Sequence, residues 1–307
     1  MKLLETVRPE LIKVLPTQNR DMQASAELQT MGIGKLVTLF LNWRDRQVYS
    51  RPRKVLKSAE ILASIEYERE ELRCRRLFAK IASGQDLTLH LSRRTRIAYL
   101  SQAERKKNKQ RPDLDLLLNE WGIHHLHLSE ADPATGFAKD DNILLFIVFK
   151  NDAAHALSLM PHGEWMNEDL VSVAVHNWPE KGLFHKLVGA LPEQALLPKE
   201  RSTLRRRHIN YFCSVDGQSY MSDTGGLSSN GTSSRSVIQM MALQRCCNLY
   251  DEQPDLLSKQ MKEEANKIGV FWPSRPVFRC ILINGVERLG FGIIEEKSGV
   301  AVGISGL

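Results

Sequence analysis

Three histidines stand within four consecutive positions of the stretch WGIHHLHLSE, residues 121–130. Imidazole is the side chain whose charge changes near neutral pH, so neighbouring imidazoles can exchange protons with a substrate or, when neutral, bind a metal ion. Seven of the nine histidines lie between His124 and His185. The middle of the chain is therefore where a chemical site is expected first.

Alternation along a β-strand assigns these histidines to two faces. His125 and His127 would share one face, while His124 would share the other with Leu126 and Leu128. If the leucine face is the buried one, His125 and His127 point away from the core. Two imidazoles two residues apart on an open sheet face could then act as an acid/base pair.

Three interpretations of the histidines remain open. The first is acid/base catalysis by His125 and His127, with His124, His162 and His176 as further candidates. The second is a metal site completed by His162, His176 or an acidic residue; the spacings HxxxH and HExxH that mark zinc sites do not occur, which makes this interpretation the weaker one. The third is that the histidines fill a strand and bond to nearby backbone.

Positive charge is concentrated in one region of the chain. Residues 44–111 hold 19 Lys/Arg and 8 Asp/Glu, a local balance of 19 − 8 = +11, so the rest of the chain carries 6 − 11 = −5. Such a region can bind a polyanion because neutralising phosphates releases counterions, although a solvated helical surface is the plainer alternative. The candidates for phosphate contact are Arg51, Arg53, Lys54, Arg93, Arg94, Arg96, Lys106, Lys107, Lys109 and Arg111.

The pattern of apolar residues predicts an α+β fold in three parts. A basic, mainly helical region covers residues 1–112. A central antiparallel meander flanked by helices covers 113–190: a helix ending at Gly122, three strands near 123–129, 142–149 and 154–162, and a helix capped by Asn167 and stopped by Pro179. Residues 191–208, with two prolines and a basic run, are the expected linker.

The last part, residues 209–307, is expected to be an α/β module. Asp216-Gly217 and Asn284-Gly285 are typical of hairpin turns. Between them, the Gly/Ser-rich stretch GGLSSNGTSSRS precedes a helix, so its amides could meet a phosphate beside Arg235. A flexible linker or a serine-capped helix start explains the same residues.

The composition bears on where the protein works. The longest apolar run, ILLFIVF at 143–149, is far shorter than the roughly 18 residues that span a bilayer. The five cysteines are odd in number and contain no CxxC, which favours a reducing compartment. The N-terminal residues lack the pattern of a secretory signal. A cytoplasmic protein that does not act in a membrane is therefore expected.

The order helix, antiparallel strands and closing helix, in WGIHHLHLS…NILLFIVF…AHALSLMPH, resembles the RelE/HigB type of toxin ribonuclease. The resemblance covers residues 110–188. It implies a small basic sheet that positions mRNA and cleaves it without a metal, with the 2′-OH of the RNA as nucleophile.

Together these patterns predict an effector that acts on nucleic acid, of the toxin-like or phage-defence ribonuclease kind, without metal or cofactor. The alternative is a DNA- or RNA-binding regulator with structural histidines. A nucleotide-binding protein that uses the Gly/Ser stretch is a third hypothesis. The sequence leaves a protein partner or self-association open.

Overall fold

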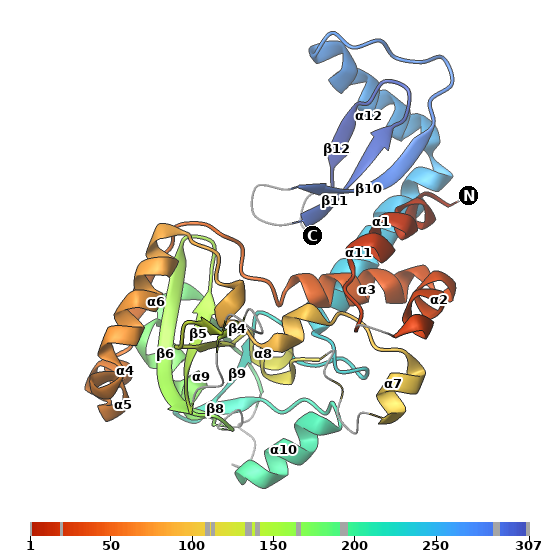
Figure 1. Ribbon diagram of the computed structural model, residues 1–307. Coiled ribbons are helices and arrows are strands. Elements are labelled where there is room, and N and C mark those ends of the chain that lie inside the picture. Colours follow the sequence, from red (N-terminus) through yellow and green to blue (C-terminus); the bar gives the residue numbers. More distant parts are fainter. Residues whose placement is uncertain are drawn as a thin grey trace. The chain divides into compact units, whose positions relative to one another are not determined.

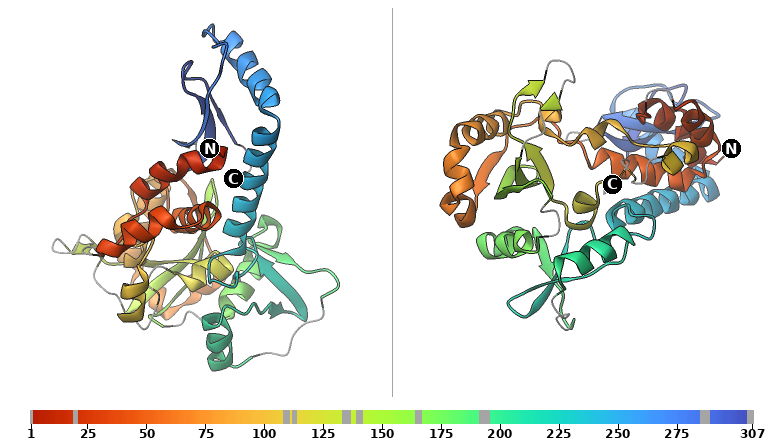
Figure 2. Two further views of the ribbon diagram at one scale, coloured as in Figure 1. Left: turned by 90° about the vertical axis from the view of Figure 1, so that its right-hand side faces the viewer. Right: turned by 60° about the horizontal axis from the view of Figure 1, so that its bottom comes forward.

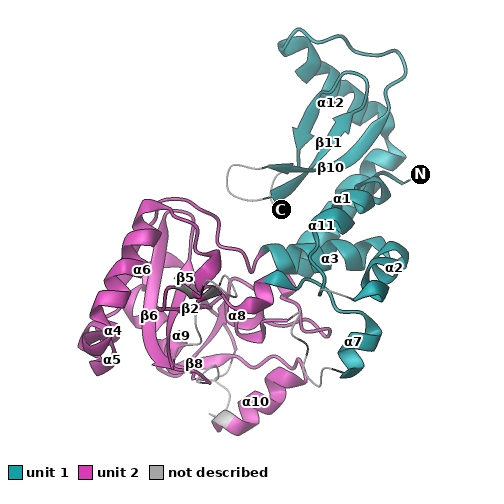
Figure 3. Ribbon diagram, in the orientation of Figure 1, with its two compact units in different colours: residues 1–44, 96–111, 236–307 teal, residues 45–95, 112–235 magenta. Residues whose placement is uncertain are grey.

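The chain folds into two compact units, each assembled from separate stretches of sequence (Figure 3). Unit 1 holds residues 1–44, 96–111 and 236–307, and unit 2 holds residues 45–95 and 112–235. The computed structural model describes residues 2–18, 21–107, 111, 114–132, 137–138, 142–163, 167–190, 196–284 and 289–304. Helices and several largely antiparallel sheets together make the predicted α+β fold.

Unit 2 is built around one mixed sheet. Its elements are β1 (Lys54–Lys57), α4 (Ala59–Ala63), α5 (Ile65–Arg69), α6 (Glu71–Ser83), η2 (Thr88–His90), α8 (Leu116–Trp121), β2 (His124–His127), β3 (Ala131–Asp132), β4 (Phe137–Ala138), β5 (Ile143–Phe149), β6 (Ala153–Pro161), α9 (Asp169–Asn177), η4 (Pro179–Lys181), β7 (Phe184–Lys186), α10 (Pro198–Arg206), β8 (Cys213–Val215) and β9 (Gln218–Ser222). The helix η3 (Arg93–Arg96) runs from unit 2 into unit 1.

The predicted meander is present as β2, β5 and β6, all antiparallel, in a sheet of order β1-β6-β5-β2. The sequence did not predict β1, which pairs in parallel with β6, Lys54 opposite Ala153. This strand has only four residues and lysine at both ends, so it shows no apolar alternation. Its pairing depends on a distant segment, which a local pattern cannot reveal.

Both faces of this sheet are buried, α6 packing on one face and α9 on the other (Figure 1). The α6 core includes Phe78, Leu126 and Leu145, and the α9 core includes Phe146 and Leu170. The prediction that His125 and His127 lie on an open sheet face is therefore wrong. Strand β5 is apolar on both of its sides, as in sheets that are covered twice, and this pattern requires a second layer of structure.

That second layer includes a small sheet of order β7-β9-β8 and the helices α8 and α9. The predicted Asp216-Gly217 turn is confirmed: both residues have positive φ, 49° and 69°, between β8 and β9. The predicted linker 191–208 is wrong over its second half, where α10 forms. Its Arg201 and Arg205 are among the largest fully buried side chains of unit 2. Residues 191–195 lie outside the described part of the chain.

Unit 1 joins the two ends of the chain in one core. Its elements are η1 (Leu3–Val7), α1 (Arg8–Val14), α2 (Met22–Thr30), α3 (Ile33–Arg44), α7 (Gln102–Lys107), α11 (Ser234–Glu252), α12 (Pro254–Lys267), β10 (Phe278–Asn284), β11 (Leu289–Glu295) and β12 (Ala301–Gly303). The first two residues of α11 belong to unit 2. Phe40 of α3 packs edge-on against Phe291 of β11, with ring centroids 5.6 Å apart.

This core is why the units differ from the predicted parts 1–112 and 209–307. The N-terminal helices and the C-terminal sheet bury their apolar faces against each other, together with α11 and α12 (Figure 2). The edge strand β10 is also closed by N-terminal side chains. Oγ1 of Thr6 accepts the Cys280 N–H (2.7 Å), and the carboxylate of Glu10 accepts the Leu282 N–H (2.7 Å). The two ends of the sequence therefore make one folding unit.

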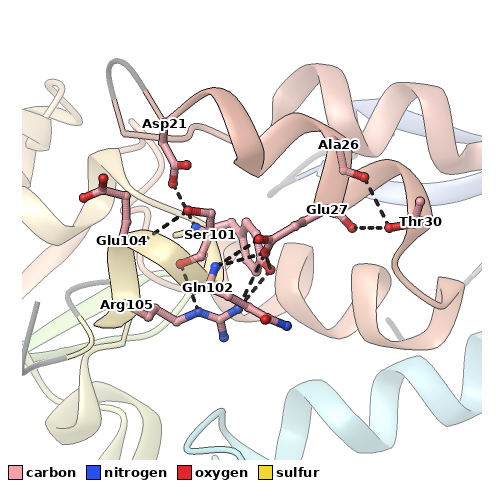
Figure 4. A network of polar contacts seen from close by, with 9 residues as sticks. Asp21, Ala26, Glu27, Thr30, Ser101, Gln102, Glu104 and Arg105 are labelled. Carbon is pink, nitrogen blue, oxygen red and sulfur yellow. Dashed lines mark hydrogen bonds and ion pairs between the residues drawn. The ribbon is translucent and has the colours of Figure 1, made fainter. Parts of the chain in front are cut away.

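The segment around α7 is tied to α2 by carboxylates of unit 1 (Figure 4). Asp21 accepts the Ser101 N–H at 2.8 Å, and Glu27 accepts the Gln102 N–H and the Tyr99 hydroxyl. Arg105 donates to the hydroxyl of Tyr99 at 3.0 Å. Part of the basic stretch therefore has a structural role within unit 1.

A buried carboxylate closes the end of the β10–β11–β12 sheet. Glu295 is fully buried and accepts the N–H groups of Val277 (3.0 Å), Lys297 (3.1 Å) and Ser298 (2.7 Å). Burial alone would raise its pKa, but these hydrogen bonds outweigh burial and lower it. A carboxylate whose pKa is lower in the folded than in the unfolded protein stabilises the fold at any pH above its pKa in the unfolded protein. That stabilisation is lost as the pH falls through its pKa in the folded protein.

We therefore expect Glu295→Ala to destabilise unit 1 by about 1–3 kcal/mol at pH 7, because three backbone N–H groups lose the acceptor that binds them. The difference from the parent protein should shrink below about pH 4. Urea titrations at pH 7 and about pH 3 measure it, with the exposed Glu296→Ala as the matched control. An equal loss at both pH values would contradict the role of the ionised carboxylate.

Candidate active site beside strand β2

A small pocket of unit 2 opens beside the first half of β2, the strand at the edge of the main sheet. An edge strand brings its side chains to the rim of the sheet, where the covering layers end. The pocket is lined by Arg46, Leu91, Ser92, Arg94, Thr95, Asp115, Leu118, His124 and His125. It therefore combines imidazoles, a carboxylate and guanidinium groups in one place.

Asp115 is held by the start of α8. As the N-cap residue its side chain accepts the Leu118 N–H at 3.2 Å. Its Oδ2 lies 3.8 Å from Nδ1 of His125, and both side chains are almost buried. Burial would raise the pKa of Asp115, but the charges of His125 and Arg94 and the bond from Leu118 lower it overall. The carboxylate is therefore ionised beside the imidazole.

The two histidines of the pocket are neutral at pH 7. Burial lowers the pKa of His124 to about 4, although Asp115 and Asp45 favour its charged form. Burial also lowers the pKa of His125, against the opposing charge of Asp115. Neutral imidazole is the form that can accept a proton, so His125 is ready to act as a base next to a carboxylate that orients it.

Guanidinium groups supply positive charge around these residues. Nη1 of Arg94 donates to the Leu114 carbonyl (2.6 Å), and Nη1 of Arg46 donates to the Arg94 carbonyl (3.0 Å), which fixes both side chains at the pocket. Arg235 pairs with Asp45 at 3.0 Å, and both charges act on the pKa of His124. Such fixed cations suit an anionic ligand such as a phosphodiester.

The other candidate histidines lie in different settings. His127 is 8% exposed, and its carbonyl accepts the Nδ1–H of His90 at 2.9 Å; its ring centroid lies 6.5 Å from that of His125. His162 is exposed just beyond β6, and its charge contributes to the low pKa of His125. His176 on α9 pairs with Asp216 at 2.8 Å. The structure thus brings His162 near His125 and pairs His176 with the β8–β9 turn.

The predicted phosphate-binding residues are spread over both units. In unit 2, Lys54 and Arg93 are exposed, Arg94 lines the pocket, and Arg51 is half-buried. Arg53 is buried and donates to the carbonyls of Lys150 (3.0 Å) and Tyr49 (2.9 Å), so its guanidinium is used by the fold.

The remaining predicted cations belong to unit 1. Arg96, Lys106 and Lys107 are exposed, Arg111 is half-buried, and Lys107 pairs with Glu104 at 2.6 Å. Lys109 lies outside the described residues.

Sequence reasoning missed two charged residues of the pocket, Asp115 and Arg46. Asp115 stands just before the apolar run LLLNEWG, and an acidic residue at that place is a recognisable helix cap. From that signal, a carboxylate could have been predicted at the start of the helix that precedes the histidine strand. Arg46 has no comparable signal, because only the tertiary fold of unit 2 brings this residue beside β2.

The Gly/Ser stretch is an ordered loop. Leu227 and Ser233 form a bridge, and Oγ of Ser228 bonds to Thr232. At the start of α11 the Ser234 N–H donates to the Gly226 carbonyl (2.9 Å) and the Arg235 N–H to Thr224 (2.7 Å). Two of the first N–H groups of α11 are therefore already paired with carbonyls of the loop and are not available to a phosphate.

No protein-family model, curated protein or solved structure matches this chain. Within the described residues, no group of three or more His, Cys, Asp or Glu side chains is arranged to hold a metal ion. No helix in the described part is both long and apolar enough to cross a bilayer. The chemistry of the pocket is therefore the basis on which a function can be proposed.

Proposed function

We propose that the protein is an endoribonuclease that cleaves RNA without a metal, with the pocket beside β2 as its active site. The observation that carries this proposal is that neutral His125, the ionised Asp115 and the guanidinium of Arg94 line one pocket. These are a base, the group that orients it and a cation for the phosphate. The resemblance of residues 110–188 to RelE/HigB-type toxin ribonucleases supports a toxin-like or phage-defence role.

In the proposed reaction His125 takes the proton from the 2′-OH of the RNA. The freed oxygen attacks the adjacent phosphorus, forming the P–O2′ bond and breaking the P–O5′ bond. The departing 5′ oxygen receives a proton from His162, the exposed imidazole whose charge reaches His125. The products are a 2′,3′-cyclic phosphate and a 5′-hydroxyl, so atoms and charges balance.

The cations of the pocket have a separate role in this scheme. Negative charge builds up on the non-bridging oxygens as the phosphorane forms, and Arg94 with Arg46 would stabilise it from fixed positions. A bound phosphodiester also raises the pKa of nearby imidazoles, because opposite charges favour the protonated form. The proton can thus stay on His125 until the product leaves.

The alternative function is a nucleic-acid-binding regulator that does not cleave. It is supported by the exposed cations Lys54 and Arg93 of unit 2 and Lys106 of unit 1. In that case phosphate contacts provide the affinity and the histidines only complete the fold. The two functions differ in whether bound RNA is broken.

The deciding experiment incubates the purified protein with labelled single-stranded RNA and with DNA of the same sequence, each with and without EDTA. We expect cleavage of RNA alone, unaffected by EDTA, and 2′,3′-cyclic phosphate ends on the products. Retention of RNA without cleavage would move the conclusion to the regulator. Cleavage of DNA, or loss of cleavage in EDTA, would overturn the proposed chemistry.

A further inference from the structure

Helix α10 of unit 2 carries cations on both its buried and its exposed side. The buried side holds Arg201 and Arg205, which are 2% and 1% exposed. Each is paired with a carboxylate of the same unit, Arg201 with Glu168 and Arg205 with Glu120. These two guanidinium groups are therefore used within the fold and are not available to a ligand.

The exposed side of α10 and its end hold three further cations, Lys199, Arg206 and Arg207. Lys199 and Arg206 are seven residues apart, or about two helical turns, so both lie on one face of the helix. The helix has one acidic residue, Glu200, whose carboxylate accepts the Leu197 N–H at 2.9 Å. Among the residues that the structure describes, no carboxylate pairs with the three exposed cations. Their charge is therefore available to a partner.

The end of α10 is packed against the segment that carries Asp115. His208, the second residue after α10, has a positive φ of 58°, and its Nδ1 donates to the Ser229 carbonyl at 3.0 Å. A Cβ atom at Gly231 would lie 2.6 Å from Nε2 of His208 and 2.8 Å from Cδ1 of Leu114. The imidazole and the leucine side chain thus close around this glycine.

The same segment borders the proposed active site. The carbonyl of Leu114 accepts Nη1–H of Arg94 at 2.6 Å, and Arg94 lines the pocket. Asn119 of α8 donates to the Gly231 carbonyl at 2.7 Å, which fixes the loop to the helix that Asp115 caps. Leu114 is therefore in contact with a pocket residue and with the loop that holds the end of α10.

We propose that Lys199, Arg206 and Arg207 bind the phosphate backbone of an RNA strand beside the site of cleavage. The inference rests on the proposed function for the identity of the polymer. Lys199 and Arg206 are separated by about 10 Å along the helix, which suits a chain of phosphates better than one small anion. Contacts to phosphates carry no sequence information, so this surface provides affinity and orientation for RNA of any sequence.

Binding of an RNA that cannot be cleaved isolates this surface. A labelled single-stranded 2′-O-methyl RNA of about 12 nucleotides lacks the nucleophilic 2′-OH and is long enough for an extended site. Its affinity for the full-length protein is measured by fluorescence anisotropy between about 0.1 and 1 M salt. Each phosphate contact to a single strand contributes about 0.7 to the slope of log K against log salt concentration.

Arg206→Ala with Arg207→Ala should lower that slope by about 1.4. Binding should be about 25-fold weaker at about 0.1 M salt and nearly unchanged at about 1 M, because the lost contacts release counterions. Arg206→Lys with Arg207→Lys keeps both charges and should keep the slope. An unchanged slope in the alanine variant, or a loss of affinity that is equal at every salt concentration, would overturn the inference.

The matched control is Arg75→Ala with Arg76→Ala. These are also adjacent exposed arginines at a helix of unit 2, on α6, and their loss changes the net charge equally. The slope should stay at the parent value, because it counts phosphate contacts and not the net charge of the protein. An equal drop in this control would refute a specific surface on α10.

RNA cleavage separates this inference from the proposed function. If RNA is cleaved and the Arg206/Arg207 alanine variant has the parent KM, the surface is wrong and the ribonuclease stands. If the 2′-O-methyl RNA binds with the expected change of slope but RNA is not cleaved, the surface stands and the catalytic proposal fails. If both hold, the variant should raise KM for long RNA about 25-fold at about 0.1 M salt and leave kcat near the parent value.

Discussion

His125→Ala should lower the rate of RNA cleavage by about 10²–10⁴-fold, the usual contribution of a general base. The imidazole is neutral because burial lowers its pKa, and Asp115 lies 3.8 Å from its Nδ1. Retention of RNA should persist, because the guanidinium groups of Arg94 and Arg46 stay in place. The measurement is single-turnover cleavage of a labelled RNA, with the retained fraction determined in parallel.

The control for this variant is His185→Ala. His185 is an exposed histidine of the same unit and pairs with Asp223. Its loss should leave cleavage within twofold of the parent protein, a range that covers the usual small effects of surface changes. An unchanged rate in His125→Ala, or an equal drop in His185→Ala, would refute the assignment of the base.

The pH dependence gives an independent test of the same pair. The kcat/KM of RNA cleavage, which reports the free protein, should rise with pH as His125 loses its proton, with a midpoint below the usual histidine value of about 6.5, since burial lowers the pKa. Asp115 favours the charged imidazole, so Asp115→Asn removes that effect and should move the rising limb to still lower pH. A shift to higher pH, or no shift, would contradict the contact.

Arg205→Ala should destabilise unit 2 by about 3–5 kcal/mol, the second large effect that the structure predicts. Arg205 donates to Glu120, and both side chains are buried, at 1% and 5% exposure. Its guanidinium also covers the indole of Trp121. Removing it leaves a buried carboxylate without its cation and a space beside the indole, and both changes cost stability.

Urea unfolding followed by tryptophan fluorescence measures this loss. Arg206→Ala is the matched control, since Arg206 is the next residue of α10 and is exposed; it should change stability by no more than about 0.5 kcal/mol. The double variant Glu120→Gln with Arg205→Met should recover part of the loss, because no charge is then buried alone. A loss for Arg205→Ala no larger than for Arg206→Ala would show that the pair does not hold α10 in place.

The sequence determined the local elements wherever the pattern is formed by neighbouring residues. The helix ending at Gly122, the three strands of the meander and the Asp216-Gly217 turn follow from apolar alternation and from residues that tolerate positive φ. The histidine strand was also found in this way. The α+β class follows from the same signals.

Only the tertiary structure decided what these elements contact. In the sequence, strand β1 and the buried arginines of α10 have the pattern of an exposed basic surface. A sequence does not show that a cation has a buried partner in another segment. The pairing of the two chain ends in unit 1 is equally non-local. In the candidate site, His124, His125 and Arg94 were predicted from the sequence, whereas Asp115 and Arg46 were found only in the structure. The structure also showed that the sheet face expected to be open is buried. Charge and periodicity are local properties, but burial and the pKa of a side chain depend on every segment packed around it.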